Sequence, residues 1–221
     1  MDGTILSGQC RIPAWANAEH LACGMSWLPV ALHPEINRYH RLEDRLARLT
    51  ARLLIRKTLQ VLGLSRESTL DDWHKSPHGR PFLLNSYADI SISHANPWVV
   101  SAVGLKCRIG IDVEIFRPFE LDALIPYLTA TEVGRIQKSS RPEVEALHCW
   151  SKREAILKAD GRGLLAPEAT IRDIAAARTP AGEAWRVKRM EFDDGCLYLA
   201  CDGATDSLRR NEWSFTELLL S

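Results

Sequence analysis

The sequence predicts an α+β fold, because two long stretches with helical periodicity alternate with several short stretches typical of strands. The first helix is expected from Arg38 to about Leu62. Within it, leucines recur every three or four positions and line one face: Leu42, Leu46, Leu49 and Leu53. This segment is therefore expected to bury its leucine face and to end at Gly63.

Arginines repeat the same rhythm one residue earlier on this helix, at Arg41, Arg45, Arg48, Arg52 and Arg56. They place a stripe of guanidinium groups beside the leucine face. Such a stripe can border a phosphate-binding pocket. It can equally be a solvated helix face that Glu43 and Asp44 partly neutralise, and the sequence leaves both interpretations open.

Three short strands are expected in the middle of the chain, at Asp89 to His94, Trp98 to Leu105 and Arg108 to Ile115. They are interpreted as antiparallel neighbours. A turn-like stretch from Ser76 to Pro81 precedes them.

A second helix is expected from about Pro142, which a first helical turn accepts, to Ala159. Gly161 is its expected C-terminal stop. Asp193-Asp194-Gly195 predicts a hairpin turn between two further strands, Trp185 to Phe192 and Cys196 to Asp202.

The composition indicates a soluble globular protein with a substantial core, since the chain has 221 residues and 46% hydrophobic content. Lys and Arg total 28, as do Asp and Glu, so no overall charge would attract nucleic acid or an anionic membrane. The six cysteines show neither CxxC pairs nor zinc-site spacing. No targeting segment or membrane-spanning apolar run is visible. We therefore expect reduced thiols and a cytoplasmic location.

Acidic side chains alternate with apolar ones along Ile109-Gly110-Ile111-Asp112-Val113-Glu114-Ile115. Asp112 and Glu114 share one strand face, roughly 6 to 7 Å apart. Two such carboxylates suit magnesium, a hard cation that also takes phosphate oxygens as ligands. An ordinary solvated strand face gives the same pattern.

Glu154 interrupts an apolar stripe on the second helix, which runs through Leu147 and Trp150 and continues to Lys158. A carboxylate facing the core is expected to hold a metal or to pair with Lys158. The alternative is a surface pair between residues four apart.

Two weaker signals precede these carboxylates. His94 ends a strand, where a histidine can bind phosphate or be an ordinary polar residue. Arg80 lies in His78-Gly79-Arg80-Pro81, whose glycine and proline are also explained by a turn.

Taken together and in order, these segments resemble the Sfp-type 4'-phosphopantetheinyl transferases. The resemblance spans about residues 38 to 165, and Thr50 to Lys57 looks like part of the family's first long helix. Four segments carry it: Gly79-Arg80-Pro81, Ile92-Ser93-His94 with Trp98, Ile109 to Glu114, and Trp150-Ser151-Lys152-Arg153-Glu154-Ala155 running through Lys158 to Gly161-Arg162-Gly163-Leu164. Arg80 and Arg153 stand where the family usually has lysine, and Ala95-Asn96-Pro97 replaces a more familiar serine or glycine turn.

The resemblance implies a monomer of two similar α+β halves, residues 1–108 and 109–221, in a pseudo-twofold arrangement. Coenzyme A is expected in the cleft between them. The apo acyl or peptidyl carrier protein is expected to dock on the segment from Ala159 to Arg186. The implied site residues are as follows: Asp112, Glu114 and Glu154 for magnesium, Lys158 and His94 for phosphate oxygens, Arg80 and Ser93 for the adenine nucleotide, and Arg48 for the 3'-phosphate.

The implied reaction moves phosphopantetheine from coenzyme A to a carrier serine and releases 3',5'-ADP. Glu154 is the expected base, acting directly or through a water, and Lys158 offsets charge on the pyrophosphate. Two alternatives stay open at this point: a magnesium-dependent phosphohydrolase and a noncatalytic module that binds coenzyme A or a carrier.

Overall fold

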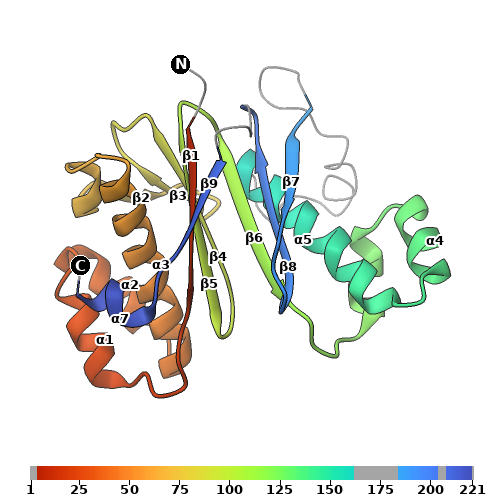
Figure 1. Cartoon of the computed structure of the whole chain (residues 1–221), viewed down its shortest axis with the longest axis horizontal. Coiled ribbons are helices and arrows are strands. Elements are labelled where there is room, and N and C mark those ends of the chain that lie inside the picture. The colour runs from red at the N-terminus through yellow and green to blue at the C-terminus, as the bar shows by residue number, and fades with distance from the viewer. Residues whose placement is uncertain (1–3, 162–183, 204–207, 221) are drawn as a thin grey trace.

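The computed structural model describes residues 4–161, 184–203 and 208–220, and its helices lie on the outer sides of a central group of strands (Figure 1). This mixture confirms the predicted α+β class. The described helices are α1 (Ala18–Met25), α2 (His33–Asn37), α3 (Leu42–Val61), α4 (Ala130–Lys138), α5 (Pro142–Asp160) and α7 (Phe215–Leu219). The described strands are β1 (Ile5–Arg11), β2 (Trp73–Lys75), β3 (Pro81–Leu83), β4 (Ala88–Ala95), β5 (Trp98–Leu105), β6 (Ile109–Ile115), β7 (Arg186–Met190), β8 (Gly195–Cys201) and β9 (Leu208–Glu212). None of these helices is both long and apolar enough to cross a membrane.

The larger sheet has the strand order β4-β5-β1-β9. Strand β5 pairs antiparallel with both β4 and β1, whereas β9 pairs parallel with β1. The C-terminal strand thus lies beside the N-terminal one, and α7 packs against α1 and α3. A separate two-stranded ribbon joins β2 and β3.

The smaller sheet has the order β6-β8-β7, and this corrects one expectation. Strands β4 and β5 are antiparallel neighbours as predicted, but β6 pairs with β8 and not with β5. The reason is that a strand has two hydrogen-bonding edges, and β4 and β1 already occupy both edges of β5. The predicted hairpin around Asp193 to Gly195 is confirmed by the antiparallel pairing of β7 with β8.

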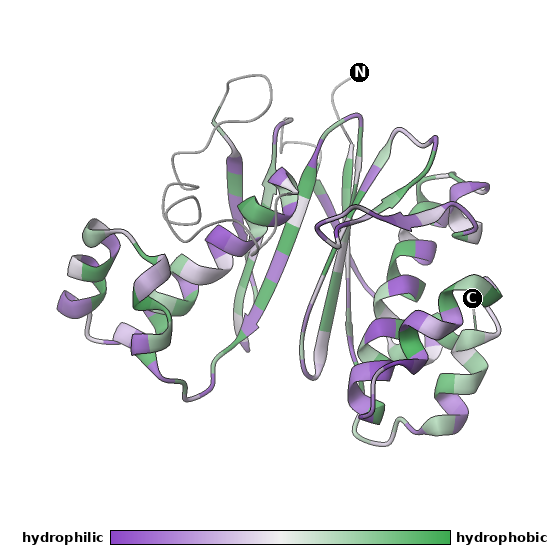
Figure 2. Ribbon diagram, turned by 180° about the vertical axis from the view of Figure 1, so that it is seen from behind, coloured by the Kyte–Doolittle hydropathy of each residue, from purple (hydrophilic) through white to green (hydrophobic). Residues whose placement is uncertain are grey.

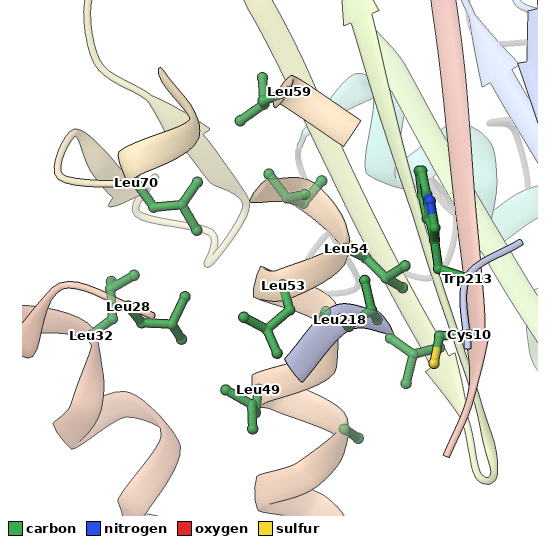
Figure 3. Close-up of a cluster of buried hydrophobic side chains, with 14 of the residues drawn as sticks. Cys10, Leu28, Leu32, Leu49, Leu53, Leu54, Leu59, Leu70, Trp213 and Leu218 are labelled. Carbon is green, nitrogen blue, oxygen red and sulfur yellow. The ribbon is translucent and has the colours of Figure 1, made fainter. Parts of the chain in front are cut away.

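Helix α3 buries the predicted leucine face against the larger sheet. Leu46, Leu49 and Leu53 are buried, and each contributes roughly 1.5 to 3 kcal/mol through its removal from water. Figure 3 shows this face between side chains of the N-terminal helical region and residues near the C-terminus, among them Leu28, Leu32, Trp213 and Leu218.

The first helix begins at Leu42 and not at Arg38. Arg41 has an extended backbone and is the N-cap residue. The acidic residues Glu43 and Asp44 occupy the first turn, where they complement the positive end of the helix dipole.

The two sheets pack face to face around a second core. Ile5, Val100 and Ala102 of the larger sheet meet the apolar side chains of β6. The predicted alternation along β6 is therefore confirmed, since Ile109, Ile111 and Val113 are buried in this core. Figure 2 shows hydrophobic stretches along the central strands and helices of mixed hydropathy on either side of them.

Helix α5 follows the prediction closely, with Pro142 in its first turn and Gly161 as its C-cap. Gly161 has φ 89°, a left-handed conformation that favours glycine. A second glycine lets this helix approach β6, because a Cβ on Gly110 would lie 2.0 Å from the carbonyl oxygen of Ala155. Each sheet thus carries one long helix on its outer side. The division at residue 108 and the pseudo-twofold relation stay predictions.

Candidate active site where the two sheets meet

The predicted site residues gather where edge strands β4 and β6 meet, between α3 and α5. A cavity of about 380 Å³ opens there. Its walls come from both sheets and both long helices, and they include Arg48, Ser93, His94, Asp112, Glu114, Trp150, Glu154 and Lys158. The structure therefore brings together seven of the eight site residues expected from the sequence, and the eighth, Arg80, lines an adjoining cavity.

Strands β4 and β6 belong to different sheets and share no ladder of backbone hydrogen bonds. Side chains of β4 hold β6 in place instead. Asp89 accepts a hydrogen bond from the backbone N–H of Ile109 at 2.8 Å, and Ser91 accepts one from that of Ile111 at 3.0 Å. The Ser93 hydroxyl donates to Asp112 at 2.9 Å. Alternate residues of β4 therefore replace the missing ladder.

Asp112, Ser93 and Lys158 form a hydrogen-bonded triangle. The Lys158 ammonium donates to Asp112 Oδ1 at 2.6 Å and to Ser93 Oγ at 2.8 Å. Only 4% of the Asp112 side chain and 28% of the Lys158 side chain are exposed. Because burial of either charge alone would be costly, each charge stabilises the other. Asp112 Oδ2 is also buried and has no hydrogen-bond partner among the described residues.

Glu154 is buried on the inner side of α5, so the surface-pair alternative is wrong. Glu154 is only 8% exposed. The Lys158 ammonium donates a hydrogen bond to Asp112 and not to Glu154. Glu154 Oε1 has no hydrogen-bond partner within the described part of the chain. Burial raises the pKa of the Glu154 carboxyl to about 7; Lys158 opposes this shift, and the Asp112 and Glu114 charges add to it.

Glu114 lies beside these groups on β6. Burial, followed by the negative charge of Asp112, raises the pKa of its carboxyl to about 7 against the opposing effects of Lys158, Arg117 and a hydrogen bond from Trp150. Three carboxylates that repel one another in one cavity are a favourable environment for a cation.

The donor chemistry of this cluster fits magnesium, because all three side chains offer carboxylate oxygens and two buried oxygens have no partner among the described residues. The described side chains do not form a ready-made metal site, however, since no three acidic, histidine or cysteine groups converge on one point. Asp112 is instead turned toward Lys158.

Glu154→Gln is expected to raise the melting temperature of metal-free protein at pH 8 and to change it little at pH 5. The folded pKa of about 7 exceeds the ordinary glutamate value of 4.5, so the stability that this group contributes below about pH 4.5 is lost as the pH rises through 7. A neutral amide avoids that loss, which is on the order of 1 to 3 kcal/mol. Thermal unfolding in a chelating buffer measures the difference.

Glu120→Gln is the matched control for that experiment, since Glu120 is exposed and its side chain caps no helix. It should change the melting temperature equally little at both pH values. An equal effect of Glu154→Gln at pH 5 and pH 8 would contradict the assigned pKa.

A larger cavity of about 640 Å³ adjoins the first and shares Arg48, Ile92, Glu154 and Lys158 with it. Several cationic side chains line it: Arg38, Arg48, Arg52, Lys75 and Arg80. The neighbouring carboxylate cluster is acidic, so the two cavities together suit a ligand with several phosphates that also carries a metal.

The arginine stripe of α3 divides between the two interpretations. Arg52 is buried, pairs with Glu35 at 2.6 Å and lines the larger cavity, so it is not part of a solvated face. Arg48 lines both cavities and lies 4.8 Å from the centre of the Tyr39 ring. Arg56 stacks on Trp27, away from the site.

His94 is exposed at the cavity wall, close to Arg48 and Lys158. Desolvation by neighbouring protein atoms and these two positive charges lower its pKa to about 4. The imidazole is therefore neutral at physiological pH and can act as a hydrogen-bond partner without adding charge.

Three residues of the site were missed by the sequence interpretation. Tyr39 and Lys75 line the larger cavity, and Asp89 links β4 to β6. No spacing rule identifies the first two, because they come from a loop and from a three-residue strand. The alternation of Asp89, Ser91 and Ser93 was a usable signal for a polar strand face.

The predicted carrier-docking segment, Ala159 to Arg186, lies mostly outside the described residues. The same holds for Arg162, Gly163 and Leu164 at the end of the last matching segment.

Comparison with known proteins finds similarity to 4'-phosphopantetheinyl transferases. The profile of the 4'-phosphopantetheinyl transferase superfamily matches residues 108–200, which include β6, α5 and the acidic cluster. A putative 4'-phosphopantetheinyl transferase of Haemophilus influenzae is 30% identical over 123 residues, covering 53% of this chain and 52% of that protein.

Two further relatives extend the match. The 4'-phosphopantetheinyl transferase Sfp of Bacillus subtilis is 27% identical over 65% of this chain and 64% of its own length. The 4'-phosphopantetheinyl transferase HetI of a Nostoc species is 27% identical over 73% of this chain and 72% of its own length. The chain thus spans about half to just under two thirds of the first two relatives. These similarities confirm that the chain resembles the Sfp-type 4'-phosphopantetheinyl transferases.

Proposed function

We propose that this protein transfers the 4'-phosphopantetheine group of coenzyme A to a serine of an apo acyl or peptidyl carrier protein and releases 3',5'-ADP. One observation carries the proposal. An acidic cavity, which contains the Asp112–Lys158 pair, adjoins a cationic cavity. The similarity to proteins named 4'-phosphopantetheinyl transferases supports the same reaction.

Coenzyme A is proposed to bridge the two cavities. Arg48 lines both and is proposed to contact the 3'-phosphate. His94 and Lys158 are proposed to contact oxygens of the pyrophosphate, with Ser93 and Arg80 bordering the adenine nucleotide. The Lys158 ammonium has three protons, and its bonds to Asp112 and Ser93 engage two of them. The third is available to a phosphate oxygen.

Magnesium is proposed to be held by Asp112, Glu114 and Glu154. When bound there, it would neutralise negative charge on the pyrophosphate oxygens. The partnerless buried oxygens of Asp112 and Glu154 support this assignment.

Glu154 is proposed to act as the base for the attacking serine, directly or through a water that it positions. A hydroxyl is a poor nucleophile at neutral pH, so its proton must leave as its oxygen bonds to the phosphorus attached to pantetheine. The bond from that phosphorus to the bridging oxygen then breaks, and the electron pair departs with 3',5'-ADP. Lys158 offsets the charge that develops on the leaving group.

The carrier is proposed to dock on the segment from Ala159 to Arg186, which follows Lys158 directly in the chain. We further propose that the protein acts as a cytoplasmic monomer. The six cysteines are all free thiols, which is compatible with a reducing compartment.

Incubation with magnesium, coenzyme A and a panel of unrelated apo carrier proteins is expected to add phosphopantetheine to the serine of at least one carrier. Intact-protein mass spectrometry measures the addition, and a known transferase acting on the same panel is the positive control. If the control modifies the carriers and this protein modifies none, the proposed function is wrong.

A further inference from the structure

The Arg80 side chain is fixed at the junction between the two sheets by contacts with three other elements. Its Nε donates to the backbone carbonyl of Lys158 at 2.7 Å, and its Nη2 donates to that of Ile109 at 3.1 Å. The same Nη2 forms an ion pair with Asp89. One guanidinium therefore connects the turn before β3 with β4, β6 and the end of α5.

We propose that Arg80 is a positioning residue, which holds the last turn of α5 so that Lys158 faces Asp112 and Ser93. The expected effect on kcat rests on the proposed function, whereas the expected effect on the position of α5 does not. It gives Arg80 a role in addition to its proposed place beside the adenine nucleotide.

The end of α5 needs such a partner, because the last four carbonyl groups of a helix lack partners within the helix. Two of them receive arginines from outside it. Arg80 bonds the carbonyl of Lys158, and Arg108 bonds that of Asp160 at 2.8 Å. Positive charge at this end also complements the helix dipole. The contact to Lys158 is the decisive one, because it fixes the backbone of the residue whose ammonium faces the reaction centre.

Asp89 makes this contact cooperative. Its carboxylate oxygen Oδ2 pairs with Arg80 and also accepts from the backbone N–H of Ile109. Only 15% of the Arg80 side chain and 18% of the Asp89 side chain are exposed, so solvent screens the pair weakly. Loss of Arg80 would leave Asp89 partly buried and without its cation, which would loosen β6 and α5 together.

Lysine at position 80 cannot reproduce this arrangement. The planar guanidinium presents its donors in a rigid fork that reaches several acceptors in different directions, whereas an ammonium is a single point of charge. Arg80→Lys therefore preserves the charge beside the nucleotide cavity but removes the contacts that hold α5. This substitution separates positioning from nucleotide binding.

Steady-state transfer kinetics and amide hydrogen exchange test the proposal in Arg80→Lys, Arg80→Ala and Asp89→Asn. We expect kcat to fall about 10- to 100-fold, because small displacements of catalytic groups are costly, while KM for coenzyme A changes less than about threefold. The amides of Ile109 and Gly161 should exchange faster in all three variants. Arg80→Lys combined with Asp89→Asn should lose little more than either alone.

Arg66→Ala is the matched control, because this arginine is 79% exposed and should change neither kinetics nor exchange. Unchanged exchange at Ile109 and Gly161 in Arg80→Lys would overturn the proposal. So would a large rise in KM with unchanged kcat, which would assign Arg80 to nucleotide binding. If wild-type protein transfers nothing, the proposed function fails, and the exchange rates still decide whether Arg80 positions α5.

Discussion

Asp112→Ala is expected to abolish phosphopantetheine transfer while the protein still folds. In the proposed site Asp112 is one of three magnesium ligands, so its loss would leave the ion short of a ligand. It also removes the partner of Lys158, whose ammonium donates to Asp112 Oδ1 at 2.6 Å. The substitution therefore disturbs both the metal ligands and the cation that faces the phosphates.

Titration calorimetry in the presence of coenzyme A measures the metal component of this effect, and Asp112→Asn separates shape from charge. The asparagine variant keeps the side-chain volume and can still accept from Ser93, so it should fold normally and bind magnesium weakly. Asp122→Ala removes an exposed carboxylate and should behave as wild type. Unchanged magnesium affinity in Asp112→Ala would show that the proposed metal site is wrong.

Glu154→Gln is expected to lower the rate of transfer by roughly 10² to 10⁴ while coenzyme A binding changes little, because the amide keeps the shape but cannot accept the serine proton. The position of Glu154 motivates this expectation. Its carboxylate is buried one helical turn before Lys158, where a structural residue would be apolar, and its Oε1 has no partner among the described residues.

Lys158→Ala provides the contrast to Glu154→Gln. Loss of the ammonium should weaken coenzyme A binding as well as slow the reaction, because phosphate charge is present both before and during transfer. Single-turnover kinetics at saturating coenzyme A, together with equilibrium binding, separate the two roles. Near-wild-type turnover in Glu154→Gln would remove this residue as the base.

Local periodicity was sufficient to predict α3, α5 and the strands β4 to β8, but α1, α2, α4, α7, β1, β2, β3 and β9 were not predicted. The leucine spacing of α3, the alternation of β6 and the stop at Gly161 each follow from short-range geometry that a sequence displays directly. Strand order is different, because it depends on which edges are already paired. The pairing of β6 with β8, and of β9 with β1, joins segments that are far apart in the chain. No local pattern encodes either choice.

For the candidate site, too, the sequence predicted the residues but not their partners. Asp112, Glu154 and Lys158 could be chosen because each interrupts or complements an apolar pattern. Their actual partners could not, since the Lys158 ammonium reaches across to β6 and not along its own helix to Glu154. The role of Arg80 was equally hidden, because its acceptors lie on three other elements.

Release of 3',5'-ADP from coenzyme A, with and without an apo carrier protein, tests the central claim most directly. A transferase should release 3',5'-ADP only when the carrier is present, in equal amount to the phosphopantetheinylated carrier formed. Release without a carrier would indicate a phosphohydrolase, and binding of coenzyme A without any release would indicate a noncatalytic module. Either of these results would contradict the proposed transfer.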